Sequence, residues 1–319
     1  MARQPYLASR RRPISLALAG CVLLGVSLAA CTSSGAGKPA ASPSVSPTAS
    51  GHGQAVSPPA ATLSGTYVAL GDSFTAAPLA HEQGGASAAC LRSAQDYPVL
   101  VAAALRPASF VNVSCFGAST ADMSQAQRTG TPPQLNALSA ADALVTVQVG
   151  GDDIGVGRIG TTCAALSLTS PFGDPCQKHY TSGGTDQLAQ AVTQTAPKVG
   201  AVLAAIRQRA PHARILLVGY PGILPASGNG CWPEVAVAHG DVPYLRGVEN
   251  ELNAMLAAAA AAHGVTFVDT YAASIGHDAC QHPGTKWVEG LIPTSVAVPF
   301  HPNALGEQAM AQEVLRALP

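Results

Sequence analysis

Short apolar runs alternate with longer alanine-rich stretches along the chain from residue 63 onward. Several of the short runs are continuously apolar, which is typical of strands in a parallel sheet that is covered on both faces. The alternation predicts an α/β fold, a three-layer α/β/α sandwich around a five-stranded, mainly parallel sheet. The predicted strands are Tyr67–Leu70, Phe110–Val113, Ala143–Val149, Ile215–Val218 and Thr266–Val268. The predicted helices are Asp96–Leu105, Asp186–Arg209, Pro243–His263 and Ala304–Leu318.

The N-terminal segment has a different pattern. The positive cluster Arg10–Arg12 precedes the mostly apolar stretch Ile14–Ala30, which ends in Leu-Ala-Ala directly before Cys31. These features describe an export signal, and the position of the cysteine resembles the lipobox of bacterial lipoproteins. We therefore expect residues 1–31 to be a lipoprotein signal peptide that is lipidated at Cys31. A plain signal peptide and a single membrane anchor are the alternatives, and the arginines also resemble a twin-arginine signal.

Residues 32–62 are rich in Ser, Thr, Pro, Gly and Ala and contain almost no large apolar side chain. Such a segment cannot bury enough surface to offset its ordering entropy. We expect a disordered tether that holds the folded domain, residues 63–319, at the extracytoplasmic face of the cell membrane, with secretion as the alternative. A net charge of −1, with 11% charged residues, excludes a basic stripe that would bind nucleic acid.

Six cysteines lie in the predicted domain. An even number of cysteines in an exported chain predicts disulfides, although six cysteines allow many connectivities. No Cys-x-x-Cys pair is present, which argues against a zinc site. Sequential pairing is the simplest arrangement, and the sequence alone does not establish it: Cys90–Cys115, Cys163–Cys176 and Cys231–Cys280.

The residues that follow the strands are the candidates for chemistry, because ligands bind beyond the carboxyl ends of parallel strands. The stretch "ALGDSFTAA" places Ser73 on a tight strand-to-helix turn, as a nucleophilic serine requires. The same pattern fits a residue that merely caps a helix. Gly117 follows the second predicted strand, Asp152 and Asp153 follow the third in "VGGDDIG", and His301 precedes the last predicted helix.

These stretches, in this order, resemble the four blocks of the SGNH-hydrolase superfamily, the GDSL lipases and esterases. The matching pieces are "GDSF", Gly117, "GGDD" and "HPNALGEQ", and the resemblance covers residues 66–318. The pieces "YP", "GHDAC" and "KWVEGLIP" are similar to secreted bacterial members with three disulfides. The resemblance implies a flavodoxin-like SGNH hydrolase fold and a monomeric serine esterase or lipase that acts on an ester or lipid substrate without a cofactor or metal.

The resemblance also implies a mechanism. Ser73 would attack the ester carbonyl and form an acyl-enzyme, with His301 as the general base. The backbone N–H groups of Ser73 and Gly117, together with the side chain of Asp152, would form the oxyanion hole.

The orientation of the histidine is the first departure from the family pattern. Family members often carry Asp three residues before the catalytic histidine, where this chain has Val298. We expect a backbone carbonyl of the Val296–Val298 stretch, that of Val298, to orient His301 instead. Asp269, after the fifth predicted strand, is the alternative.

Asp152 is the second departure, because the family has at this position an Asn whose amide donates to the oxyanion. An ionised carboxylate only accepts hydrogen bonds. Either burial and the nearby Asp153 keep Asp152 protonated, or the site is weak. In the second case the protein would be a catalytically weak or inactive surface lipoprotein that binds an acylated ligand or a cell-envelope polymer. Asp153 itself is expected to accept hydrogen bonds from turn amides.

Overall fold

The computed structural model describes residues 62–81 and 88–319, so the predicted signal segment and residues 32–61 of the predicted tether lie outside the described residues. Five strands form one sheet in the order β2-β1-β3-β4-β5, and every neighbouring pair is parallel. Each strand matches its prediction to within one residue at either end. The strands are β1 (Thr66–Gly71), β2 (Ser109–Asn112), β3 (Asp142–Gln148), β4 (Arg214–Val218) and β5 (Thr266–Val268).

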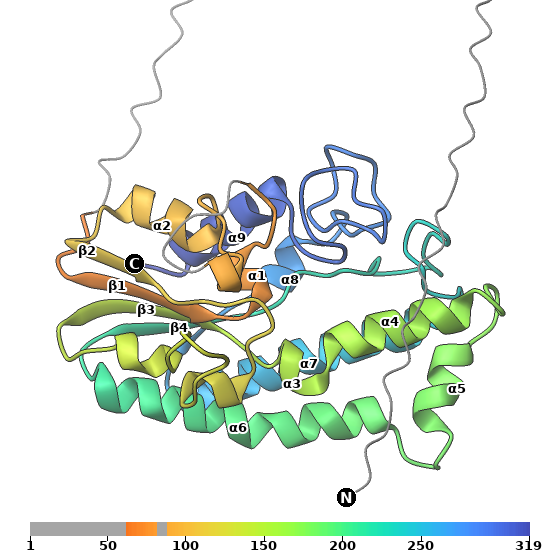
Figure 1. The fold of residues 1–319 in the computed structure, drawn as a ribbon, viewed down its shortest axis with the longest axis horizontal. Helices are drawn as coiled ribbons and strands as arrows, with labels where there is room; N and C mark the ends of the chain where they lie inside the picture. Colours follow the sequence, from red (N-terminus) through yellow and green to blue (C-terminus); the bar gives the residue numbers. More distant parts are fainter. Residues whose placement is uncertain (1–61, 82–87) are drawn as a thin grey trace, which may run out of the picture. The chain divides into compact units, whose positions relative to one another are not determined.

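Helices cover both faces of the sheet, which confirms the predicted three layers (Figure 1). One face carries α2 (Tyr97–Leu105) and α9 (Ala304–Arg316), and the other carries α6 (Gln187–Arg209) and α7 (Val242–Ala262). Successive strand residues serve the two faces in turn, as the pleat requires. In β1, for example, Tyr67 enters the core under α2 and α9, and Val68 enters the core under α6 and α7.

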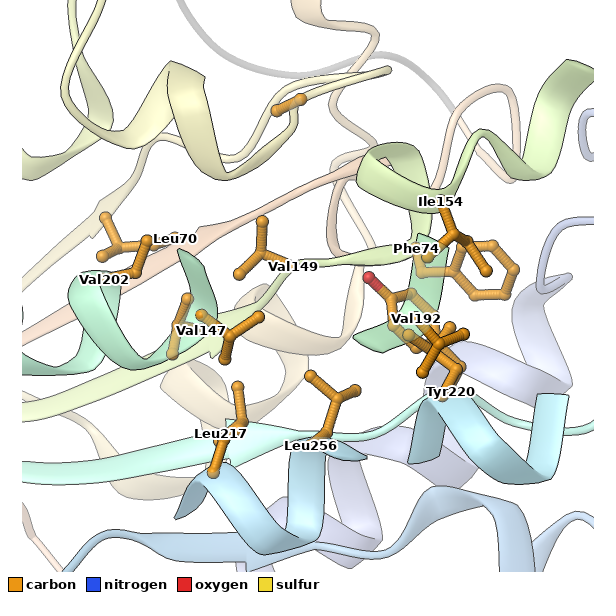
Figure 2. Close-up of a cluster of buried hydrophobic side chains, with 14 of the residues drawn as sticks. Leu70, Phe74, Val147, Val149, Ile154, Val192, Val202, Leu217, Tyr220 and Leu256 are labelled. Atoms are coloured by element: carbon orange, nitrogen blue, oxygen red, sulfur yellow. The ribbon is translucent and has the colours of Figure 1, made fainter. Parts of the chain in front are cut away.

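The larger core lies between the sheet and the pair α6 and α7. Figure 2 shows Val147 and Leu217 of the sheet facing Leu256 of α7, with Phe74 and Tyr220 at one end of the same cluster. Complete burial of a Val or Leu side chain contributes about 1.5–3 kcal/mol relative to exposure. This cluster therefore anchors the carboxyl ends of the strands.

Five further helices were not among the sequence predictions. They are α1 (Ser73–Ala76), α3 (Gly151–Ile154), α4 (Val156–Ser167), α5 (Pro175–Thr181) and α8 (Thr270–Ala273). Two of them directly follow strands β1 and β5, and α3 begins three residues after β3 ends.

Three disulfides connect the long loops, and their pairing is the sequential one. Cys90–Cys115, Cys163–Cys176 and Cys231–Cys280 have Cα–Cα distances of 4.2, 5.0 and 5.5 Å. The second bond joins α4 to α5, and the third joins the loop after β4 to the segment after α8.

Two buried carboxyl groups lie at the N-terminus of α2, and one of them joins it to α9. Glu307 of α9 accepts the Tyr97 N–H at 2.6 Å through Oε2, while its buried Oε1 has no partner among the described residues. Asp96 caps α2 by accepting from Val99 N–H at 3.0 Å. Burial raises the pKa of Glu307 well above its ordinary value, and raises that of Asp96 to about 7.

We predict that Glu307→Gln weakens the pH dependence of stability. A carboxyl group with a raised folded-state pKa keeps its proton after the unfolded chain has lost it, so stability falls as the pH rises from about 4.3 through the folded pKa. The free energy of unfolding should therefore drop less between about pH 5 and pH 8 in the variant than in the wild type. Urea unfolding at the two pH values measures this, with the exposed Glu251→Gln on α7 as the control. Equal drops in the Glu307 variant and the wild type would contradict the prediction.

Candidate active site

Ser73 and His301 are in contact although 228 residues separate them in the sequence. The distance from Ser73 Oγ to His301 Nε2 is 2.8 Å. Ser73 is the first residue of α1 and therefore follows the end of β1 closely. His301 lies two residues before Asn303, the residue that caps α9 by accepting from the N–H groups of Leu305 and Gly306. The strand-end turn and the last helix thus bring together the two residues that the sequence singled out.

Buried polar groups fix the turn that carries Ser73. The Gln134 side chain accepts the Gly71 N–H at 2.8 Å and donates to the Gly71 carbonyl at 2.9 Å. Asp72 caps α1 by accepting from Phe74 N–H at 3.0 Å. The sequence allowed this turn to hold a residue that merely caps a helix, and that residue is Asp72. The Ser73 hydroxyl therefore remains available to His301.

The orientation of His301 differs from the expectation by one residue. Its Nδ1 lies 2.9 Å from the carbonyl oxygen of Pro299, whereas the Val298 carbonyl accepts the backbone N–H of His301. The backbone of Phe300 has a left-handed conformation (φ 62°), which turns the Pro299 carbonyl towards the ring. Asp269 is exposed and caps α8 by accepting from Ala272 N–H, so it does not take this role.

The Pro299 carbonyl also fixes the tautomer of His301. A carbonyl can only accept, so Nδ1 carries the ring proton and Nε2 is left to accept from the Ser73 hydroxyl. The ring packs near Phe74 and Phe116, with centroids 5.1 and 5.8 Å away. Burial lowers the pKa of His301 below 6.5, with the bond to Pro299 opposing this effect, so the imidazole is neutral at neutral pH and able to take a proton.

A buried ion pair anchors the loop before His301. The Glu289 carboxylate, which is fully buried, lies 2.9 Å from Lys286 Nζ and accepts from Asn303 Nδ2 at 2.7 Å and Thr294 N–H at 2.7 Å. Burial alone would raise the pKa of Glu289, but these donors outweigh it and lower the pKa to about 2. The Glu289 N–H donates to the His301 carbonyl at 3.0 Å, so the charged cluster sets the position of the histidine.

Backbone hydrogen bonds bring two further strand ends up to the Ser73 turn. Cys115 N–H donates to the Gly71 carbonyl, and Asp72 N–H donates to the Gln148 carbonyl. Gly117 and Asp152 follow these bonds by two and four residues. Within residues 62–81 and 88–319, the N–H groups of Ser73 and Gly117 make no hydrogen bond. They are therefore free to donate to a ligand.

The two neighbouring aspartates have different surroundings. Asp153 accepts from the Thr120 N–H at 2.8 Å, as expected of it, and lies 3.6 Å from Lys198 Nζ. The Asp152 carboxylate has no hydrogen-bond partner in the described part of the chain. Burial, and then the charges of Asp153 and Asp122, raise the pKa of Asp152 to about 6.

Tyr220 connects the two turns of the site, and the sequence analysis assigned it no role. Its hydroxyl donates to Asp72 Oδ2 at 2.5 Å and accepts the Gly151 N–H at 2.9 Å. Its ring meets that of Phe74 edge-on at 5.2 Å (Figure 2). The sequence signals for this residue are its place just after strand β4 and its position in the piece "YP", neither of which indicates these contacts.

The model of the GDSL-like Lipase/Acylhydrolase family matches residues 69–309. A parallel sheet whose strand ends hold a serine and a histidine in contact is the arrangement expected of that class. The chain belongs to this family and is a carboxylic ester hydrolase of the lipase or esterase type.

Streptomyces proteins are among the relatives. Lipase 2 of Streptomyces coelicolor is 39% identical, with 82% of this chain and 88% of the relative aligned, and Lipase 1 of the same organism is 32% identical over 76% and 82%. The crystal structure of phospholipase A1 from Streptomyces albidoflavus NA297 has a TM-score of 0.66 and 29% identity, over 80% of this chain and 99% of that one. The extracellular lipase from Streptomyces rimosus has a TM-score of 0.65 and 27% identity, over 80% and 100%.

We predict that Tyr220→Phe impairs ester turnover through positioning. The phenyl ring keeps the contact with Phe74, but Gly151 N–H loses its acceptor and Asp72 loses a donor, at a cost of about 1–3 kcal/mol. We expect kcat to fall about tenfold with KM nearly unchanged. The control is Tyr180→Phe, since Tyr180 is a largely buried residue whose hydroxyl makes no hydrogen bond within the described residues. A Tyr220 variant with the turnover of the control would show that the hydroxyl does not position the site.

Proposed function

We propose that Ser73 and His301 hydrolyse carboxylic esters through an acyl-enzyme, and the observation that carries this proposal is the 2.8 Å contact between Ser73 Oγ and His301 Nε2. Ser73 Oγ attacks the ester carbonyl carbon while its proton passes to Nε2. The tetrahedral intermediate collapses, the alcohol leaves with that proton, and the acyl group remains on Ser73. Water then attacks the acyl carbonyl carbon while its proton passes to Nε2. The second tetrahedral intermediate collapses, the acid is released, and Ser73 Oγ regains the proton.

The histidine works as one half of a dyad whose orienting group is the Pro299 carbonyl. This carbonyl holds the ring in the tautomer that accepts from Ser73. It is neutral, so it stabilises the imidazolium that forms in each step less than a carboxylate would. Part of the stabilisation of the transition state must therefore come from the oxyanion hole.

The oxyanion hole consists of the free N–H groups of Ser73 and Gly117 and the side chain of Asp152. Protonated Asp152 donates to the oxyanion in place of the family's Asn, as a neutral carboxylic acid can. Its raised pKa of about 6 supports this role at mildly acidic pH. Above that pH the ionised carboxylate repels the oxyanion.

The substrate is the ester of a lipid, and the support comes from relatives that are named lipases and a phospholipase A1. The chain is anchored to the outer face of the membrane through Cys31, and the support for this is the cysteine after Leu-Ala-Ala and the Ser/Pro-rich stretch behind it. The three disulfides fit an oxidising, extracytoplasmic location.

A serine-directed phosphonate tests the nucleophile. We expect a p-nitrophenyl alkylphosphonate to label the protein once, at Ser73, and to abolish hydrolysis of p-nitrophenyl butyrate in proportion to labelling. Peptide mass spectrometry locates the label, and Ser73→Ala serves as the control that is neither labelled nor active. Labelling at another residue, or full hydrolysis by Ser73→Ala, would overturn the assignment.

Asp152→Asn tests the oxyanion hole. In the wild type, kcat/KM should rise as His301 loses its proton below pH 6.5 and fall as Asp152 ionises near pH 6, which gives a narrow maximum at mildly acidic pH. An amide donates at every pH, so the variant should lose the alkaline decline and gain about 10²-fold at about pH 8, the value of one oxyanion donor. The control is Asp269→Asn, an exposed helix cap that should leave the profile unchanged. An alkaline plateau in the wild type would disprove the role of the proton.

A further inference from the structure

Exposed apolar side chains gather in the two segments that carry Ser73 and His301. Among the described residues, eight large apolar side chains are exposed, and five of them lie within residues 73–81 or 289–305. The most exposed of these five are Ile292 at 80% and Val296 at 70%. We call these five residues the apolar rim: Leu79, Leu291, Ile292, Val296 and Leu305.

The two segments are in contact, and the buried Glu289 is the only Asp, Glu, Lys or Arg in them. Val298 N–H donates to the Pro78 carbonyl at 3.2 Å, which joins the loop before His301 to the turn after α1. Residues 73–81 and 290–302 contain no Asp, Glu, Lys or Arg. These two stretches, which carry Ser73 and His301, therefore present no formal charge where they border the path of a substrate to Ser73.

Hydrogen bonds hold the loop that carries Leu291, Ile292 and Val296 of the apolar rim. Glu289 holds Thr294 through the backbone N–H and the hydroxyl, at 2.7 and 3.2 Å. Leu291 N–H donates to the Glu234 carbonyl at 3.0 Å, and Phe300 N–H donates to the Glu289 carbonyl at 3.1 Å. The buried ion pair of Glu289 thus stabilises a loop in which Ile292 and Val296 are exposed to water. Exposed apolar groups are unfavourable in water unless another surface covers them.

We propose that the apolar rim docks the enzyme on the surface of aggregated lipid, so that the ester reaches Ser73 directly from that surface. This inference rests on the proposed function, since it assumes a lipid ester as substrate. A protein partner or a second copy of the chain seated on the rim would close the path to Ser73 and His301. A lipid surface covers the same side chains and supplies the substrate through the same contact. The absence of charge fits a neutral or zwitterionic surface.

The test compares binding with two kinds of hydrolysis. The test variant is Leu291→Ser/Ile292→Ser/Val296→Ser. The control is Leu168→Ser/Phe172→Ser, which removes two side chains about as exposed as Ile292 and Val296; they lie after α4, about 18 Å along that helix from α3. All proteins carry Cys31→Ser, so that acylation cannot supply the contact. Binding to phosphatidylcholine vesicles is measured by flotation with Ser73→Ala added, which separates docking from catalysis.

We expect the test variant to bind vesicles at least tenfold more weakly and to hydrolyse emulsified long-chain esters at least tenfold more slowly, because three insertable side chains are lost. Its hydrolysis of monomeric p-nitrophenyl butyrate should stay within about twofold of the parent, as should all properties of the control. The single variant Ile292→Ser should show a smaller loss of vesicle binding and of emulsified-ester hydrolysis. If the triple variant also loses butyrate hydrolysis, the single variant tests the proposal in its place.

Unchanged vesicle binding by the test variant, or an equal loss of vesicle binding in the test and control variants, would overturn the proposal that the apolar rim docks on lipid. So would a dimer in sedimentation that the three substitutions dissociate, since the rim would then be covered by a second copy. In each of these cases, intact butyrate hydrolysis that depends on Ser73 leaves the proposed function standing. Absence of butyrate hydrolysis in the parent, with vesicle binding retained, would instead refute the function and keep the surface.

Discussion

The hydrogen bond between Ser73 and His301 is the contact on which the rest of the site depends, because it must be held across 228 residues of chain. Catalytic groups work only when they stay within about 0.5 Å of a productive arrangement. Buried polar groups therefore stabilise each side of the contact. On the serine side, Gln134 hydrogen-bonds to both backbone groups of Gly71. On the histidine side, Glu289 accepts a hydrogen bond from Asn303. Such networks are rigid because every broken bond would leave an unpaired group away from water.

The carboxylates around the site divide by whether they have donors. Asp72 has Phe74 N–H and the Tyr220 hydroxyl, Asp153 has Thr120, and Asp122 has Ser119, while Asp152 has none in the described part of the chain. Burial raises the pKa of Asp72 well above its ordinary value in spite of these donors, and burial followed by the charges of Asp153 and Asp122 raises the pKa of Asp152 to about 6. The two departures from the family pattern concern the placement of a carboxyl group. One is missing beside the histidine, where the Pro299 carbonyl accepts from the ring instead, and one is present at the proposed oxyanion position, where it would donate only in its neutral form.

The sequence predicted the sheet and the two central residues because their signals are local. Continuous apolar runs ended by glycine or polar residues set the strands to within one residue, and motif blocks at the strand ends located Ser73 and His301. The helices α3, α4 and α5 gave no such signal. Gly157 and Gly160 weaken α4 as a helix, and its partner α5 is fixed by the Cys163–Cys176 bond, which is a tertiary feature.

The remaining misses also depend on long-range packing. The carbonyl that orients His301 is that of Pro299, next to the left-handed backbone of Phe300, whose N–H donates to the distant Glu289 carbonyl. Tyr220 acts through partners 148 and 69 residues away, so no local pattern could reveal its role. The disulfide pairing could be proposed from the sequence, but only the folded chain shows that each pair is close enough to join.

The proposed docking of the apolar rim and the proposed proton on Asp152 would reinforce each other. Contact with a lipid surface removes water from the mouth of the site, and loss of water favours the neutral form of every titratable group there. For Asp152 the neutral form is the hydrogen-bond donor, and for His301 it is the base. Both groups therefore move towards their active forms when the rim is covered, and the oxyanion contacts strengthen as the local dielectric falls. A carboxyl group that limits the enzyme in water is thus best suited to an enzyme that works at an interface.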